Sequence, residues 1–203
     1  MGCHAIELVY VLDPMCSWCW GFRAELQKFT DALGDHEMTY VMGGLAKDSD
    51  EPMPDEMRDY VQNAWRAVAA RTGAEFNHAF WTTCRPRRST YPACRAVLAA
   101  GLQDAKDSMI EAIQSAYYLE ARNPSDDDTL SELAGEIGLA RHRFAVDVTS
   151  PAVTDLLRDD LGLRRELGVT RFPTLLLQRS EGCHVLAAGY ATADDMRTSM
   201  RRT

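Results

Sequence analysis

The chain has 203 residues, of which 46% are apolar and 26% are charged. This composition supports a packed core and excludes disorder along the whole chain, and the length fits one domain or a small domain with a large insertion. Acidic residues outnumber basic ones by 30 to 22, so the formal net charge is −8. We therefore expect no general binder of nucleic acid or anionic membranes, because both need a basic face. No apolar run approaches the roughly 20 residues that span a bilayer.

The first part of the chain predicts a strand, a helix and a second strand. Residues 4–12 are rich in β-branched and apolar side chains, and Asp13-Pro14 ends the run. Between residues 17 and 33, apolar side chains recur every three or four positions, which is typical of a helix with one buried face. Residues 38–42 predict another short strand.

About a hundred residues with helical signals follow a polar, proline-containing loop at 47–56. Apolar stripes recur at helical spacing, Pro92 suits the first turn of a helix, and Asp126, Asp127 and Asp128 place negative charge where a helix dipole favours it. Helices are predicted around residues 57–68, 92–100, 109–117, 130–137 and 151–161.

The end of the chain returns to strand. Residues 174–178 form a continuous apolar run, residues 183–188 predict a partner strand, and a last helix begins near Thr192. This order favours an α/β fold in which the β-rich ends share one mixed central sheet, interrupted by an all-α insertion. We expect residues 1–46 and 151–203 to form the sheet domain and residues 47–150 the helical insertion.

The strongest chemical signal is the pair Cys16 and Cys19, which are separated by two residues at a predicted strand–helix junction. This spacing lets two sulfur atoms approach bonding distance within one helical turn. Free amides and the helix dipole at the N-terminus stabilise a thiolate on Cys16, which can then attack disulfides near neutral pH. Cys19, one turn later and more covered, would be the resolving thiol.

Two alternatives for this pair stay open. Cys16 and Cys19 can form half of a zinc site that Cys84, Cys94 or Cys183-His184 would complete, although structural zinc sites usually show two compact ligand pairs. The two cysteines can also be buried and inert.

A second motif precedes the apolar strand near the C-terminus. Gly168 to Thr174 reads GVTRFPT, and Pro173 stands at the strand start, where a residue without a backbone N–H is tolerated. A cis bond before Pro173 would turn the backbone of Phe172 toward the cysteines, where it can pair with an extended substrate. Only about 5–6% of such bonds are cis, so the residues alone favour trans.

Together, DPMCSWCWG at residues 13–21 and GVTRFPT at residues 168–174 resemble the DsbA-like family of thioredoxin-fold oxidoreductases, in particular a cytoplasmic-type branch with a CSWC site and a helical insertion. Residues 88–96 resemble that branch more loosely. The resemblance covers nearly the whole chain. It implies a thioredoxin-like fold, thiol–disulfide exchange through Cys16 and Cys19, and a cis Pro173.

The resemblance and the residues together give a specific functional hypothesis. Strong oxidants of the family carry Pro-His between the cysteines, whereas this chain has Ser17-Trp18, so the disulfide should be a weaker oxidant. The N-terminal residues also lack the pattern of a secretory leader. We therefore expect a cytoplasmic reductase or isomerase, without metal or organic cofactor. Its partners would be disulfide-containing proteins or glutathione as co-substrate, and a recycling reductase.

The catalytic residues expected are Cys16, Cys19 and Pro173, and the substrate-binding residues are Ser17, Trp18 and Phe172. Met15 and Tyr10 are candidates to extend this apolar surface. Cys94 and Cys183 are expected to pack in the interior and Cys3 to be exposed. The basic loop around Cys84 is expected to be solvated, although its arginines can lower the pKa of Cys84 or bind an anion. None of the five histidines (4, 36, 78, 142 and 184) adjoins the two cysteines in sequence.

Two other functions stay open. A glutathione-dependent isomerase or transferase of the same fold would use one Ser or Cys, which would leave Cys19 without a role. A non-enzymatic adaptor protein would use the dithiol as a switch or not at all.

Overall fold

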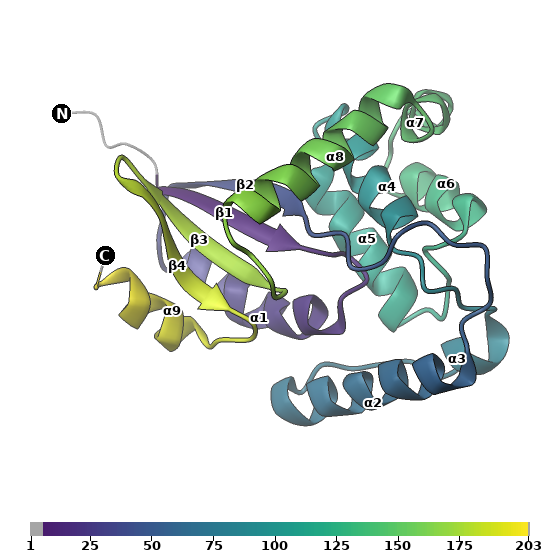
Figure 1. The fold of residues 1–203 in the computed structure, drawn as a ribbon, viewed down its shortest axis with the longest axis horizontal. Coiled ribbons are helices and arrows are strands. Elements are labelled where there is room, and N and C mark those ends of the chain that lie inside the picture. Colours follow the sequence, from purple (N-terminus) through teal and green to yellow (C-terminus); the bar gives the residue numbers. More distant parts are fainter. Residues whose placement is uncertain (1–5, 203) are drawn as a thin grey trace.

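In the computed structural model, the described residues, 6–202, form a four-stranded mixed sheet with helices around it (Figure 1). β1 (Ile6–Leu12) runs parallel to β2 (His36–Met42) and antiparallel to β3 (Thr174–Arg179), which pairs antiparallel with β4 (Gly182–Ala188). The strand order is β2-β1-β3-β4. The two ends of the chain therefore share one sheet, as the sequence predicts. Cys3, His4 and the predicted start of the first strand lie outside the described residues.

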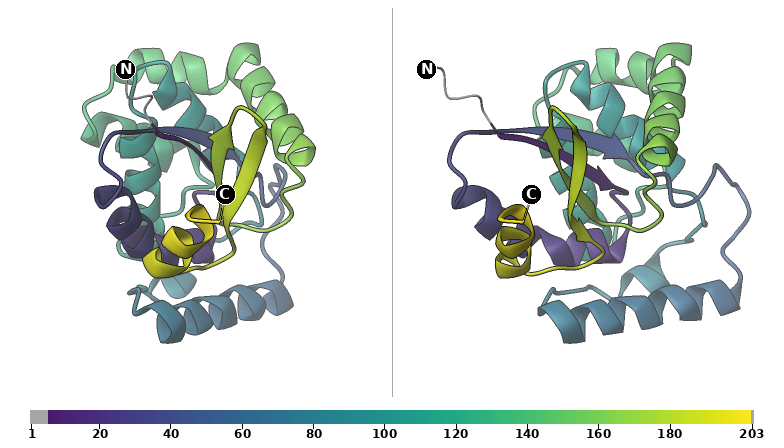
Figure 2. Two further views of the ribbon diagram at one scale, coloured as in Figure 1. Left: turned by 90° about the vertical axis from the view of Figure 1, so that its left-hand side faces the viewer. Right: turned by 60° about the vertical axis from the view of Figure 1, so that its left-hand side comes forward.

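The side chains of β1 alternate between two cores, as expected for a strand that is covered on both faces. Leu8, Tyr10 and Leu12 belong to the main core, which includes side chains of α1 (Ser17–Asp31). Val11 joins a smaller cluster with Val41, Val169 and Leu176. α9 (Ala193–Met200) lies beside α1, and α8 (Pro151–Glu166) packs on β2 (Figure 2).

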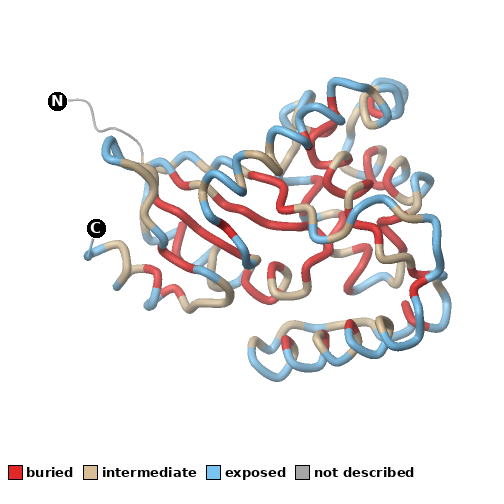
Figure 3. Tube along the Cα trace, in the orientation of Figure 1, coloured by how far each residue is buried: buried red, intermediate tan, exposed pale blue. Residues whose placement is uncertain are grey.

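Helices fill the chain between β2 and α8. Their bounds are α2 (Asp55–Thr72), α3 (Phe80–Thr83), α4 (Tyr91–Gly101), α5 (Lys106–Tyr118), α6 (Asp127–Glu136) and α7 (Arg141–Val148). α4 is buried at nearly every position and packs against α5, α6, α7 and α8 (Figure 3). The sequence did not predict α3, which has only four residues, or α7, in which Phe144 alone is buried.

α2 packs against α1 and lies next to the short helix α3 (Figure 1). A Cβ on Gly21 would lie 2.6 Å from Val68 and 3.0 Å from Thr72, so the absence of a side chain there lets the two helices approach closely. The fully buried Trp65 of α2 contacts the rings of Phe76, Phe80, Trp81, Tyr117 and Tyr118. Aromatic packing around Trp65 thus stabilises the position of α2 beside α1.

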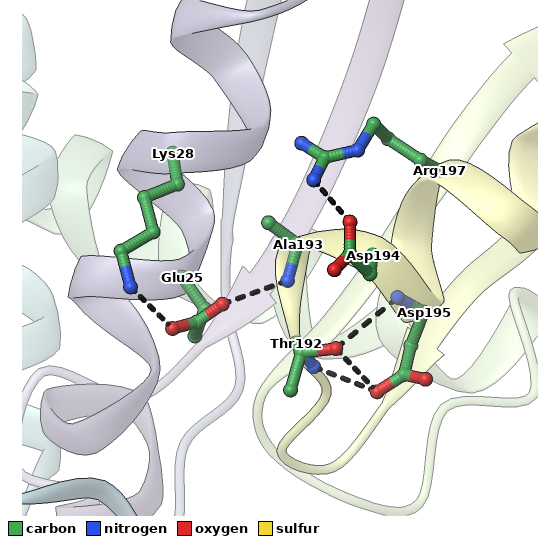
Figure 4. Close-up of polar contacts among 7 residues, drawn as sticks. All are labelled: Glu25, Lys28, Thr192, Ala193, Asp194, Asp195 and Arg197. Carbon is green, nitrogen blue, oxygen red and sulfur yellow. Dashed lines mark hydrogen bonds and ion pairs between the residues drawn. The ribbon is translucent and has the colours of Figure 1, made fainter.

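The C-terminal helix is anchored to α1 (Figure 4). Thr192 caps α9 by accepting a hydrogen bond from the Asp195 amide, and the Asp195 carboxylate accepts one from the Thr192 amide. The Ala193 amide donates to Glu25 of α1 over 2.8 Å, and Glu25 also pairs with Lys28. Within residues 6–202 no helix combines the length and apolar character needed to cross a membrane.

Candidate active site

Cys16 stands at the N-cap position of α1, directly after the turn that ends β1. Its amide donates to the Asp13 carbonyl over 3.0 Å, and its own carbonyl accepts from the Trp20 amide over 3.1 Å. Its side chain makes no capping hydrogen bond. The first amides of α1 therefore have no side-chain cap and are available to stabilise negative charge on the Cys16 sulfur.

The two cysteines of the motif differ in exposure and in acidity. Cys16 is 8% exposed and Cys19 is fully buried, and both are free thiols. A hydrogen bond from the Cys19 thiol lowers the pKa of Cys16, as do the amides of Cys19 and Trp18, while burial and Asp13 oppose this effect. Burial raises the pKa of Cys19 well above the usual thiol range. Cys16 is consequently the more acidic and the more exposed thiol of the pair.

Phe172 and Pro173 lie opposite the cysteines. The Cys16 thiol is 4.0 Å from the Phe172 carbonyl oxygen, and the Phe172–Pro173 bond is cis, as the family resemblance implied. The Phe172 ring packs on Gly43, where a Cβ would come within 2.5 Å of it. Arg164 lies over the same ring and donates to the Gly43 carbonyl over 2.6 Å. These contacts fix the Phe172 backbone beside Cys16.

Asp13 organises the turn before Cys16, whereas the sequence pattern predicts only that it ends a strand. Its carboxylate is fully buried and accepts hydrogen bonds from the Met15 amide (2.9 Å), the Leu45 amide (2.6 Å) and the Thr90 hydroxyl (2.6 Å). The Cys94 thiol lies 3.7 Å from the same oxygen that Thr90 contacts. The sequence carries a signal for this role of Asp13. An Asp between a buried strand and a CxxC pair indicates a fixed turn, because Asp commonly stabilises such turns.

A cavity of about 650 Å³ opens beside Cys16. The predicted residues Ser17, Trp18 and Phe172 line it together with Cys16, whereas Cys19 and Pro173 are not among its lining residues. Trp18 also contacts the Tyr190 ring, with centroids 6.3 Å apart. The structure thus brings Ser17, Trp18 and Phe172 together around Cys16.

Three arginines from separate parts of the chain line the same cavity: Arg71, Arg88 and Arg171. Among the described residues no Asp or Glu lines the cavity, and none of the three arginines forms an ion pair. Arg71 lies over the Tyr190 ring at 5.1 Å. In a chain with a net charge of −8, the surroundings of Cys16 are therefore locally cationic.

The structure differs from two further expectations, which concern Tyr10 and Cys84. Met15 lines the cavity, but Tyr10 does not: it lines a separate cavity with side chains of α1, β2 and α5, because residues 8, 10 and 12 of β1 share the face toward α1. Burial raises the pKa of Cys84, so the neighbouring arginines do not lower it. Arg87 forms an ion pair with Asp126 over 2.7 Å and does not stabilise a Cys84 thiolate.

The other cysteines that the structure describes do not join Cys16 and Cys19. Cys84 donates to the Ala121 carbonyl, Cys94 to Asp13, and Cys183 to Gln178. Across residues 6–202 no group of three or more His, Cys, Asp or Glu side chains is arranged to hold a metal ion. The zinc set that the sequence left open is therefore not assembled there.

Residues 9–197 match the family described as thioredoxin. The chain belongs to the thioredoxin family. Among solved structures, this family member is similar to the cytosolic disulfide reductase DsbM from Pseudomonas aeruginosa, with 28% identity, a TM-score of 0.77 and coverage of 97% of both chains. The form of DsbM solved with GSH matches with 27% identity and a TM-score of 0.76, over 97% of this chain and 98% of that one.

Among curated proteins, this thioredoxin-family chain is similar to the ClpXP adapter protein SpxH from Bacillus subtilis. The two are 25% identical over 182 residues, which is 85% of this chain and 60% of the relative. The chain therefore spans about 60% of the length of that curated relative. The family match and the likeness to these structures together place the chain among the DsbA-like oxidoreductases of thioredoxin fold.

Proposed function

We propose that this chain is a thiol–disulfide oxidoreductase that works as a reductase or isomerase through Cys16 and Cys19. The observation that carries the proposal is that the pKa values of two thiols in contact are shifted in opposite directions. Cys16 at the start of α1 has a lowered pKa, whereas the buried Cys19 has a raised one. The thiolate is the nucleophile in thiol–disulfide exchange, so this tuning selects Cys16 for the first attack.

The proposed reaction has two exchange steps. The Cys16 thiolate attacks a substrate disulfide and forms a mixed disulfide, and one substrate sulfur leaves as a thiolate. Cys19 then attacks the Cys16 sulfur, which releases the second substrate sulfur and leaves a Cys16–Cys19 disulfide. The Phe172 carbonyl beside Cys16 supports the binding of an extended substrate backbone across the site. A recycling reductant returns the enzyme to the dithiol form.

The lining of the active-site cavity favours a substrate with negative charge. Arg71, Arg88 and Arg171 provide three guanidinium groups, and guanidinium binds carboxylates well. Glutathione carries two carboxylates and fits this requirement, and the likeness to a reductase solved with GSH supports it. We therefore propose glutathione or its mixed disulfides as co-substrate, and the cytoplasm, where DsbM works, as the location.

Two single variants test the proposal. Cys16→Ser should abolish the reduction of insulin, whereas Cys94→Ser should retain it, because Cys94 is a buried thiol outside the pair. Cys19→Ser should trap a mixed disulfide between Cys16 and glutathione, visible as added mass. Reduction of insulin at an unchanged rate by Cys16→Ser would refute the proposal.

An adaptor is the second candidate, because the curated relatives that match are ClpXP adapter proteins. An adaptor would bind its client whether or not Cys16 is present. Capture of one stable partner by both the wild type and Cys16→Ser, with no dithiol exchange by either, would favour this function over the oxidoreductase.

A further inference from the structure

A second cavity, of about 520 Å³, shares no lining residue with the active-site cavity. Alternate residues of β1 and β2 line it from the sheet, and residues three or four positions apart on α1 and α5 line it from the two helices. These spacings put one face of each element toward the cavity. Its volume lies within the range of about 300–1,000 Å³ that is typical of small-ligand sites. We call it the α1–α5 cavity.

The buried part of the α1–α5 cavity contains an unpartnered polar group. Gln114 of α5 lines the cavity and is 1% exposed, and among the described residues its side-chain carbonyl oxygen has no hydrogen-bond partner. Buried polar groups without partners are rare in folded proteins and call for an explanation. A carbonyl oxygen only accepts hydrogen bonds, so the group that satisfies it must be a donor.

The exposed part of the α1–α5 cavity carries an excess of negative charge. Asp31 of α1 and Asp107 and Glu111 of α5 line it and are exposed, and one arginine, Arg23 of α1, lines it with them. Arg23 pairs with Glu111 over 2.6 Å and so joins the two helices. Among the described residues, Asp31 and Asp107 form no ion pair. The cavity therefore attracts cations, in contrast to the cationic active-site cavity.

An organic ammonium ion suits this lining better than an anion or a bare metal ion. An anion would meet the two unpaired carboxylates and the acceptor oxygen of Gln114. A metal ion needs several ligands around one point, and across residues 6–202 no three or more His, Cys, Asp or Glu side chains are arranged in that way. An ammonium group is positively charged and has three donors and no acceptor, so it satisfies both the carboxylates and the Gln114 oxygen.

The apolar part of the lining favours a ligand with a hydrocarbon chain. Leu26, Met38 and Ile110 line the α1–α5 cavity beside its charged groups. Methylene groups pack well on such a surface while a charged end stays with polar partners. Asp31 and Asp107 belong to different helices, so a chain with an ammonium group at each end has a carboxylate partner for both ends.

We propose that the α1–α5 cavity binds a linear aliphatic polyamine. Its ammonium groups pair with Asp31 and Asp107 and donate to the Gln114 carbonyl oxygen, and its methylene groups pack on the apolar side chains. The cavity includes neither Cys16 nor Cys19. The inference therefore goes beyond the proposed dithiol function and does not depend on it.

Isothermal titration of the protein with spermidine, at an ionic strength of about 0.15 M, tests the proposal. The wild type should bind spermidine saturably, and a neutral diol of the same chain length should not bind. Asp107→Asn should weaken binding roughly fivefold, because it removes one carboxylate at an exposed position where the fold tolerates the change. Gln114→Leu should weaken binding roughly tenfold, because it removes a buried acceptor for a charged donor.

Asp59→Asn is the matched control for Asp107→Asn. It removes an exposed carboxylate from α2, outside the α1–α5 cavity, and changes the net charge of the chain by the same amount. Its affinity for spermidine should equal that of the wild type. Equal weakening by both variants would show that spermidine responds only to net charge, and would overturn the site. Wild-type affinity in Gln114→Leu, equal binding of the diol, or no saturable binding by the wild type would overturn it as well.

Discussion

The Cys16 sulfur lies 4.0 Å from the Phe172 carbonyl oxygen, although 156 residues separate the two in sequence. The contact joins the start of α1 to the residue before cis Pro173. It depends on the Phe172 ring, which is held between the Gly43 backbone and the Arg164 side chain. The position of Cys16 relative to the Phe172 backbone is therefore set by packing as well as by the CxxC motif.

Gly43→Ala tests this packing directly. A Cβ at position 43 would lie 2.5 Å from the Phe172 ring, so the ring must move, which should cost about 1–3 kcal/mol of unfolding free energy and slow disulfide exchange. Gly162→Ala is the control, since nothing lies within 4 Å of a Cβ there and α8 should gain roughly 0.5–1 kcal/mol. Urea unfolding measures both, and equal stability of Gly43→Ala and the wild type would contradict the packing argument.

The acidity of Cys16 should depend on the thiol of Cys19, because the hydrogen bond from Cys19 is the largest influence that lowers the Cys16 pKa. Cys19→Ala removes this donor and should shift the pH midpoint of Cys16 alkylation upward. Cys19→Ser keeps a donor and should shift the midpoint less. Alkylation rates with iodoacetamide, measured across pH, give both midpoints. A Cys19→Ala midpoint at or below that of the wild type would show that another group stabilises the thiolate.

Asp13 should make the stability of the protein depend on pH. Burial raises the Asp13 pKa in the folded state, so folding favours the protonated form. Its contribution is complete below the unfolded pKa of about 3.9 and is lost as pH rises through the folded pKa. The stability of the wild type relative to Asp13→Asn should therefore decrease as pH rises from about 4. Urea unfolding at several pH values tests this.

Asp59→Asn serves as the control for Asp13, because Asp59 is an exposed carboxylate on α2. Its stability difference from the wild type should stay nearly flat over the same pH range. A flat difference for Asp13→Asn as well would mean that the buried carboxyl does not titrate between the folded and unfolded states.

The arginines of the active-site cavity should select for charge on the substrate. Arg171→Gln should raise KM for oxidised glutathione by roughly fivefold, which corresponds to about 1 kcal/mol, and leave kcat nearly unchanged. The effect should disappear with the ester of oxidised glutathione in which both carboxylates of each half are methylated, because that substrate lacks the carboxylate charges. Arg66→Gln is the control, since Arg66 of α2 bonds to Asn63 away from the cavity. An equal loss with both substrates would argue against charge recognition.

Local patterns in the sequence were sufficient to predict most of the fold. The strands, the helix after Cys16 and the helix capped by Thr192 all carry signals within a few residues of one another, and the structure contains each of them. α7 was missed because its sequence presents only Phe144 to the interior, so no apolar stripe marks it.

The surroundings of the cysteines were harder to predict, because they come from segments far apart in the chain. The contact between Asp13 and Thr90 spans 77 residues, and the cavity arginines come from positions 71, 88 and 171. The placement of Tyr10 away from the active-site cavity depends on which face of β1 meets α1. A one-residue change of register would reverse that placement, and the sequence pattern alone did not settle it.

We propose that Cys16 and Cys19 form a reversible couple of reducing character. Equilibration of the protein in glutathione buffers of graded potential, followed by acid quench, alkylation and mass mapping, measures that couple directly. We predict one two-electron transition that links Cys16 to Cys19, with a potential nearer the thioredoxin value of about −270 mV than the DsbA value of about −120 mV. A disulfide that excludes Cys16, no transition at all, or a potential near about −120 mV would contradict the account.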